Sequence, residues 1–219
     1  MAKGILMVAT VGDDEEAVMV GVRDYPVRKL VLLHTPEHEA TARSIVAKVE
    51  AVYVAAEARA IDPADVLMDT MRHVADVIAA HGVELPDVVM NVSSGDKMQT
   101  CSALSAAFVH GVPAIGVMEG GPFALPVLKF SYAELISDAK FRIMQALERR
   151  GGRASSLAEL ATWSDVDKGL LSYHLRTTRD GKGLEDMGLV SIERGSFGRL
   201  GIELTDMGRV LLLGRAQPV

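Results

Sequence analysis

Several features that would place this chain in a common class of protein are missing from its sequence. Its 219 residues include one cysteine, Cys101, so no disulfide can form within the chain, which fits a reducing cytosol. No run of about 18 uncharged apolar residues occurs, so we expect no membrane span and no membrane partner. The apolar run after the first residues is too short for a signal peptide, and we therefore expect a cytoplasmic protein.

Glycine-rich phosphate loops and metal-ligand clusters are also missing. A dinucleotide site needs Gly-x-Gly-x-x-Gly after its first strand, whereas Ile5–Thr10 is followed by one glycine, Gly12, and then by the acids 13–16. No Gly-x-x-x-x-Gly-Lys-Ser/Thr pattern is present. The six histidines are scattered, and Cys101 falls in an apolar stretch where packing is the expected role. We therefore expect no cofactor, no metal site and no identifiable catalytic residue.

The charge is distributed unevenly along the chain. The net charge is −6, but residues 1–131 carry 10 basic and 17 acidic residues, while residues 132–219 carry 13 and 12. An acidic half joined to a neutral or weakly basic half is common when only one end of a protein meets nucleic acid. The length suits two domains, which we expect to cover residues 1–131 and 132–219.

The first half alternates short apolar runs with longer helical patterns. This alternation predicts a Rossmann-like α/β domain, a parallel sheet with helices on both faces. The expected strands are Ile5–Thr10, Lys29–Thr35, Glu57–Ile61, Asp87–Ser93, Pro113–Met118 and an edge strand at Val127–Ser131. The expected helices are Glu15–Asp24, Pro36–Ala56, Pro63–His81 and Asp96–His110.

Two loops of this half are candidates for a ligand site. In such a sheet the ligand crevice lies at the carboxyl ends of the strands where the strand order reverses, which we expect between the first and fourth strands. The loops there are residues 10–13 and 93–97. The second loop is low in bulk, its serines can donate hydrogen bonds, and Lys97 supplies a cation beside a helix N-terminus. An alternative interpretation is a tight turn that only caps a helix.

The second half predicts a winged helix-turn-helix. A helix over Tyr132–Arg150 ends at a glycine pair, Ser156 opens a second helix that runs through Thr162, and Ser164, with Asp167 in its first turn, opens a third. Two alternating segments, 188–193 and 200–204, then form a hairpin, and Thr205 caps a last helix.

The third helix and the hairpin tip carry polar and cationic residues suited to DNA. A helix placed after such a turn reads the major groove, and a basic hairpin behind it contacts phosphates or the minor groove. The expected DNA contacts are Lys168, Ser172, Tyr173, His174, Arg176, Arg179, Arg194 and Arg199. Because the half is nearly neutral, a protein-contact module is the alternative. The reader helix is expected to end near Thr178.

At these two loops and in this order of halves, the chain resembles the CRISPR-associated Rossmann fold (CARF) regulators of archaea that carry a winged helix-turn-helix. The first half resembles them through residues 10–15 and 91–98, and the winged half resembles ArsR/MarR-type domains through residues 171–176, 187–190 and 204–208. The resemblance implies a homodimer in antiviral CRISPR defence. Its ligand would be a cyclic oligoadenylate, with cyclic tetra-adenylate as the expected ring, and its second partner would be double-stranded DNA.

The resemblance also implies which residues meet the ligand. They are Thr10, Val11, Gly12, Asp13, Asn91, Ser93, Ser94, Gly95, Asp96, Lys97 and Met98. Asp96 departs from the family loop, which often has a threonine before the lysine. Two alternatives stay open: a ring nuclease that cleaves the cyclic ligand without metal, and a winged-helix regulator that senses an unrelated small molecule.

Overall fold

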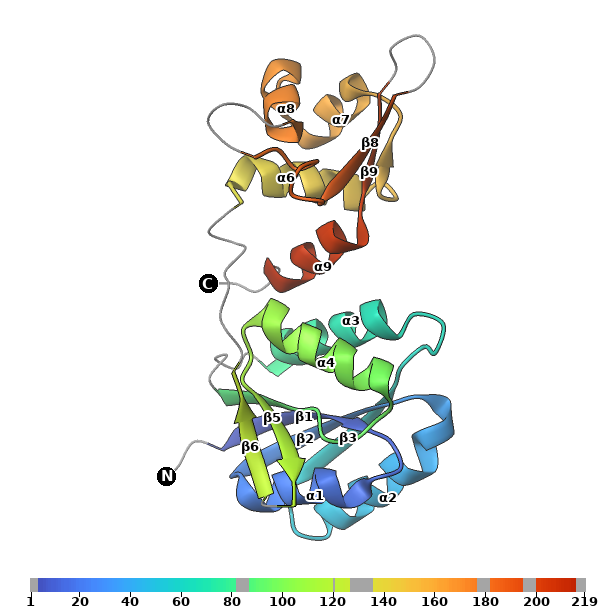
Figure 1. Ribbon diagram of the computed structural model, residues 1–219, viewed down its shortest axis with the longest axis vertical. Helices are drawn as coiled ribbons and strands as arrows, with labels where there is room; N and C mark the ends of the chain where they lie inside the picture. The colour runs from blue at the N-terminus through green and yellow to red at the C-terminus, as the bar shows by residue number, and fades with distance from the viewer. Residues whose placement is uncertain are drawn as a thin grey trace. The chain divides into compact units, whose positions relative to one another are not determined.

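The computed structural model describes residues 4–81, 87–119, 121–126, 136–176, 182–194 and 200–215 of the chain. The chain divides into two compact units, Met1–Phe130 with Val219 and Ser131–Pro218. Figure 1 shows a sheet covered by helices in the first unit and a smaller group of helices with a short sheet in the second. Within the described ranges, no helix is long and apolar enough to cross a membrane.

The first unit is built on a six-stranded sheet in the order β3-β2-β1-β4-β5-β6. Its strands are β1 (Ile5–Val11), β2 (Val27–His34), β3 (Ala55–Ala60), β4 (Val88–Asn91), β5 (Ala114–Met118) and β6 (Gly121–Leu125). The strands β1 to β5 pair in parallel, and β6 alone runs antiparallel, against β5. The strand order reverses between β1 and β4, which confirms the predicted switch point.

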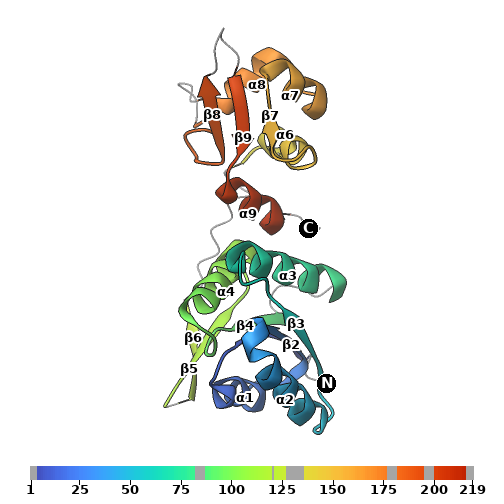
Figure 2. The same ribbon diagram turned by 90° about the vertical axis from the view of Figure 1, so that its right-hand side faces the viewer.

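Helices cover both faces of this sheet, as the α/β class predicted. Figures 1 and 2 show α1 and α2 on one face and α3 and α4 on the other. Their bounds are α1 (Glu15–Asp24), α2 (Glu39–Glu50), α3 (Val66–His81) and α4 (Lys97–His110), with a 3-10 turn η1 (Pro36–His38) before α2. Because both faces are covered, central strands such as β4 are buried along their whole length, which explains their continuous apolar runs.

Two predicted helices of this unit are shorter than expected. The segment 36–56 divides into η1 and α2, and the chain then turns through Tyr53, whose φ of 63° breaks the helix, into β3. The segment from Pro63 begins as a turn, because the Asp62 carboxylate accepts the Ala64 amide at 2.8 Å, and α3 starts at Val66. Cys101 is exposed on α4, so the expected packing role is wrong.

The edge strand β6 was not predicted. Gly121 and Pro122 are residue types typical of turns, yet they open β6, and Gly121 has a φ of 105° that only glycine adopts easily. A Cβ on Gly116 would lie 2.6 Å from Phe123 Cζ, so the Phe123 ring packs directly on the Gly116 backbone of β5. The edge strand expected at Val127–Ser131 lies outside the described residues.

The second unit has the element order of a winged helix-turn-helix. In its described ranges, three helices are followed by a hairpin and a last helix, with the sheet in the order β7-β9-β8. The elements are α6 (Asp138–Glu148), β7 (Arg153–Ala154), α7 (Leu157–Ser164), α8 (Lys168–Leu175), β8 (Val190–Arg194), β9 (Leu200–Leu204) and α9 (Asp206–Arg215). Apolar residues of all three leading helices and of the hairpin share one core.

The ends of the leading helices differ from the prediction. The helix expected from Tyr132 begins at Asp138 with Ser137 as its N-cap. The Ser164 hydroxyl donates to the Leu160 carbonyl at 2.7 Å, so Ser164 closes α7 and does not cap α8. The α8 cap is Asp167, which accepts the Gly169 amide at 2.8 Å.

The helix α8 also ends earlier than expected, at Leu175. The returning chain accounts for this end, because the Leu184 amide donates to the His174 carbonyl at 2.9 Å and the Glu185 amide to the Leu175 carbonyl at 3.0 Å. These bonds satisfy carbonyls that the helix leaves open at its terminus. The expected end near Thr178 lies outside the described residues.

A buried histidine makes the stability of the first unit depend on pH. His110, the last residue of α4, is 4% exposed, and burial lowers its pKa to about 4 against a smaller opposing effect of the Met71 backbone. The unfolded chain therefore binds a proton at a higher pH than the folded chain does, and protonation favours unfolding. The stability associated with His110 is complete above about pH 6.5 and declines as the pH falls toward 4.

We expect the free energy of unfolding of the first unit to fall by about 2 kcal/mol more in the wild type than in His110→Leu when the pH changes from about 7 to about 5. Urea titrations followed by circular dichroism at the two pH values measure this difference. His110→Leu serves as the control for the pH dependence of all other titratable groups, because these groups are the same in both proteins. Equal pH dependence in the two proteins would show that His110 is not buried in its neutral form.

Candidate functional site

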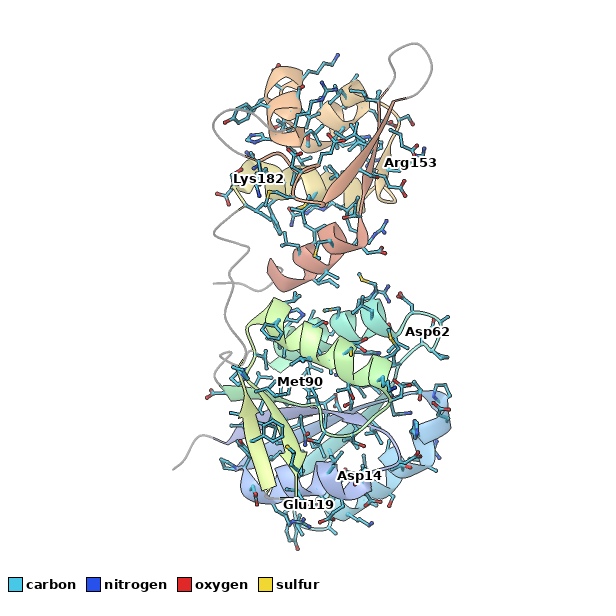
Figure 3. The ribbon with its side chains drawn as sticks, in the orientation of Figure 1. Asp14, Asp62, Met90, Glu119, Arg153 and Lys182 are labelled. Atoms are coloured by element: carbon cyan, nitrogen blue, oxygen red, sulfur yellow. The ribbon has the colours of Figure 1, made fainter. Side chains whose placement is uncertain are left out.

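The candidate ligand site lies where β1 and β4 end side by side. The loops that follow them cross at two glycines, and a Cβ on Gly12 would lie 2.6 Å from the Gly95 amide nitrogen and 2.7 Å from its Cα. Gly95 has a φ of 110°, in the region that favours glycine. Figure 3 labels Met90, in the strand β4 that leads into the second loop, and Asp14, the N-cap of α1 that follows the first loop. The residue type at both positions is therefore dictated by the close approach of the backbones.

Side-chain hydrogen bonds hold the crossing together. The Thr10 hydroxyl donates to the Ser94 carbonyl, and the Ser94 hydroxyl accepts the Gly12 amide at 3.0 Å. Thr10 is fully buried and Ser94 is 3% exposed. Both were predicted to contact a ligand, but their side chains instead form the two hydrogen bonds between the loops, which we call the brace.

A third polar residue of the predicted set also faces inward. Asn91 is fully buried at the end of β4, and its Oδ1 accepts the Ser93 amide at 3.0 Å and the Ser93 hydroxyl. Its Nδ2 lies 3.5 Å from the Ala17 carbonyl of α1. Asn91 thus sets the conformation of the second loop, and the half-buried Ser93 is the member of the pair nearer the surface.

Gln99 was missed in the sequence and is the centre of the site's hydrogen bonding. It is fully buried in the first turn of α4, where its Oε1 accepts the Asp96 amide at 2.8 Å and its Nε2 donates to the Val11 carbonyl at 3.4 Å. Asp96 in turn accepts the Gln99 amide at 2.8 Å, which completes a capping box. The spacing Asp-x-x-Gln in the sequence could have revealed this role.

The acids of the first loop are mostly occupied by contacts within the protein. Asp14 caps α1, Glu15 pairs with Lys48, and Glu16 pairs with Arg23. The hydrogen bond from Arg23 holds the pKa of Glu16 below its ordinary value. Asp13 is the member of the group whose carboxylate extends fully into solvent.

The end of β2 adds residues that sequence reasoning set aside. His38 Nε2 lies 3.4 Å from the Asp13 carboxylate, and its Nδ1 lies 3.1 Å from the Thr35 hydroxyl. Thr35 and His34 are buried there, with His34 Nδ1 2.9 Å from the Thr35 carbonyl. The carboxyl ends of β1, β4 and β2 therefore border the solvent-exposed side of the two loops, which we call the mouth of the site.

Groups able to meet a ligand remain exposed at the start of α4. Lys97 and Met98 are exposed, and within the described part of the chain Lys97 has no acidic partner. The backbone amides of these two residues also donate to no acceptor in the described ranges, as is usual in the first turn of a helix. A cation beside free amides at a helix N-terminus favours an anionic ligand. Among the described residues, no group of histidine, cysteine and carboxylate side chains could hold a metal ion.

The second unit presents a polar surface on α8. Lys168, Tyr173 and Arg176 are exposed and Ser172 is half-buried, so these four predicted DNA contacts lie on the outer side of the helix. Tyr173 meets His174 edge to face, with 5.4 Å between ring centroids. The residues Arg179 and Arg199 and the side chain of Arg194 lie outside the described residues.

His174 does not belong to this surface. It is 9% exposed, and burial, with the neighbouring charge of Lys140, lowers its pKa. His174 was predicted to contact DNA together with the adjacent Tyr173. Because α8 turns about 100° per residue, His174 instead lies on the core side of the helix, beside Leu171 and Leu175. His174 is therefore removed from the set of DNA contacts.

A family model described as "HFX_2341_N:-like, N-terminal" matches residues 6–118, which is just over half of the chain. The match spans the sheet from β1 to β5 and includes both loops of the site. No curated protein matches the chain.

Solved structures offer distant likenesses. Can2 from Sulfobacillus thermosulfidooxidans, in complex with cyclic tetra-adenylate, is 12% identical with a TM-score of 0.46, over 95% of this chain and 61% of Can2. A type III CRISPR defence DNA nuclease activated by cyclic oligoadenylate is 21% identical with a TM-score of 0.48, over 57% of this chain and 20% of the nuclease. A MarR family transcriptional regulator from Silicibacter pomeroyi DSS is 23% identical with a TM-score of 0.28, over 36% of this chain and 48% of the regulator. The chain spans less than two thirds of each, and likeness at this level says nothing about which ligand or partner it binds.

We expect Gly12→Ala to destabilise the first unit by about 1–3 kcal/mol, because the added methyl group meets the Gly95 backbone, which cannot move without breaking the brace. Urea unfolding at neutral pH measures the loss. The control is Gly201→Ala, where the added Cβ would find its nearest atom at 3.8 Å. A loss no larger than that of the control would contradict the close crossing of the loops.

Proposed function

The chain belongs to the HFX_2341_N:-like, N-terminal family, and from this premise and the geometry of its two units we propose that it is a ligand-responsive DNA-binding regulator of the CARF type. Residues 1–131 would form the sensing domain and residues 132–219 the DNA-binding domain. The observation that carries the proposal is the braced crossing of the β1 and β4 loops, which leaves Lys97 and free amides at the mouth.

The chemistry of the mouth supports a phosphodiester ligand. The first turn of α4 offers amides and a lysine to an anion, while Met98 offers exposed apolar surface on which a base can lie. The ligand that the CARF resemblance implies, a cyclic oligoadenylate, has both kinds of group. A four-membered ring can itself have a two-fold axis, so one ring would suit a symmetric pair of chains.

The negative charge of Asp96 would repel a phosphate, but its role as the N-cap of α4 reduces this conflict. One carboxylate oxygen accepts the Gln99 amide as the α4 cap, so part of the negative charge is balanced by the helix N-terminus. The acids at positions 14–16 are likewise engaged with a helix end or with basic side chains. Asp13, which faces His38, is the one acid of that loop that would have to tolerate a phosphate nearby.

DNA binding is supported by the exposed face of α8. Lys168, Tyr173 and Arg176 combine two cations with an aromatic ring on the helix that follows the turn at Asp165. Asp165 adopts the left-handed conformation in this turn, with a φ of 53°, and a short turn of this kind between two helices supports a helix-turn-helix. The ligand would then act by changing the affinity of the second unit for DNA.

Calorimetric titration with cyclic tri-, tetra- and hexa-adenylate, and with linear tetra-adenylate as the comparison, tests the sensing role. We expect one ring to bind at one per two chains, and Lys97→Ala to weaken it by about tenfold or more through loss of a charge-assisted contact. Lys168→Ala is the matched control, a lysine at the start of a helix in the other unit. Absence of binding by all the rings would refute the ligand, and conversion of the ring to linear products, followed by chromatography, would favour the nuclease.

Fluorescence anisotropy with a labelled random-sequence duplex tests the DNA role. Lys168→Ala should weaken binding and should reduce the slope of log K against log salt by about 0.9, the effect of one lost phosphate contact. Here Lys97→Ala is the control and should bind DNA as the wild type does. A ring that leaves the DNA affinity unchanged would contradict the coupling of the two units.

A further inference from the structure

A cavity on the second unit is used by none of the roles proposed above. It has a volume of about 320 Å³ and lies between α6 and α7, which Figures 1 and 2 show side by side. Its walls include Arg142, Gln145, Arg149 and Arg150 from the α6 segment and Trp163 from α7. This volume is at the lower end of the range found for small-molecule sites in proteins.

Among the described residues, the three arginines of this cavity have no acidic partner. In the described ranges no carboxylate lies within ion-pair distance of Arg142, Arg149 or Arg150, and the adjacent Glu148 pairs with Arg209 at 3.4 Å. The C-terminal end of α6 favours cations at Arg149 and Arg150, but Arg142 lies about two turns earlier and gains nothing from the helix end. Like charges gathered without counter-charge repel each other, and an anion from solution would relieve that repulsion.

The remaining wall is aromatic. Trp163 is the sole tryptophan of the chain and is partly buried against the core of the second unit. The Arg150 guanidinium lies 5.9 Å from the centroid of its ring. An aromatic ring beside an arginine is a common platform for a nucleobase, and the Gln145 amide can both donate to and accept from the edge of a base.

We propose that this cavity binds a phosphorylated nucleotide, with the base against Trp163 and the phosphates between Arg142 and Arg149. The nucleotide class is favoured over a simple anion because the cavity joins three cations to an aromatic wall. The site is separate from the switch-point loops and from the exposed face of α8, so it is an addition to the function proposed above and does not depend on it.

The tryptophan provides a direct measurement. Because Trp163 is the sole tryptophan, the intrinsic fluorescence of the full-length protein excited at the indole band reports on the surroundings of this one residue, which lines the cavity. We expect ATP to quench this fluorescence with a saturable curve and inorganic pyrophosphate to compete with ATP. Adenosine should bind at least about tenfold more weakly than ATP, because it lacks the groups that the arginines hold.

Two variants locate the site, and two others are compared with them. Arg142→Gln and Arg149→Gln should each weaken ATP by about tenfold, since each removes a charged hydrogen-bond donor from the phosphates. Arg153→Gln is the control, because Arg153 is an exposed arginine of the same unit that pairs with Glu193 at 3.2 Å, away from the cavity. Trp163→Phe should keep the ATP affinity within a few-fold by calorimetry, since the aromatic wall remains.

Several outcomes would overturn this assignment. One is the absence of saturable quenching by ATP, and another is an ATP affinity that Arg142→Gln and Arg149→Gln leave unchanged. Quenching by duplex DNA without quenching by ATP would show that the arginines hold a DNA backbone instead. Weakening of ATP by Lys97→Ala would place the nucleotide at the switch-point loops, whereas an unchanged affinity in that variant supports the separate site.

Discussion

The first unit depends on the place where the backbones after β1 and β4 touch. Two adjacent parallel strands deliver their loops to one edge of the sheet, and the loops can cross at Gly12 and Gly95 because neither position carries a Cβ. The Thr10 and Ser94 hydroxyls then hold the two loops together by hydrogen bonds in the buried interior. A buried polar group without a hydrogen bond would lower the stability of the fold. The buried polar residues thus serve to hold the loops, and the groups left for recognition are the peripheral ones.

The sequence could not show which polar residues of the two loops hold the loops together and which remain exposed for a ligand. The strands β1 to β5, the switch point and the two loops followed from apolar runs and from the chain direction of a parallel sheet. The inward or outward direction of each polar side chain did not follow, because Thr10, Asn91 and Ser94 differ from Ser93 and Lys97 in their tertiary partners and not in their local pattern. His174 was misplaced for the same reason, since one step along α8 separates the exposed face from the core.

Helix boundaries and the edge strand failed for more specific reasons. Ser164 and Asp167 both suit a cap, and the outcome was decided by the Asp165 turn and by the Ser164 hydroxyl turning back to Leu160. Gly121-Pro122 has the composition of a turn, yet its pairing with β5 depends on the contact of Phe123 with Gly116, which no local pattern contains. Tertiary contacts overrode local preference in both cases.

Both edges of the large sheet carry residues that disfavour pairing with a further strand. At one edge, Pro122 in β6 has no amide hydrogen to donate. At the other edge, β3 carries Glu57 and Arg59. Burial alone would raise the pKa of Glu57, but hydrogen bonds from Lys29 and Arg59 outweigh it and lower the pKa. The strand therefore keeps charged side chains. A strand added by a second molecule would therefore lose a ladder hydrogen bond at one edge and meet charged side chains at the other. These features disfavour stacking into fibres through β-edges.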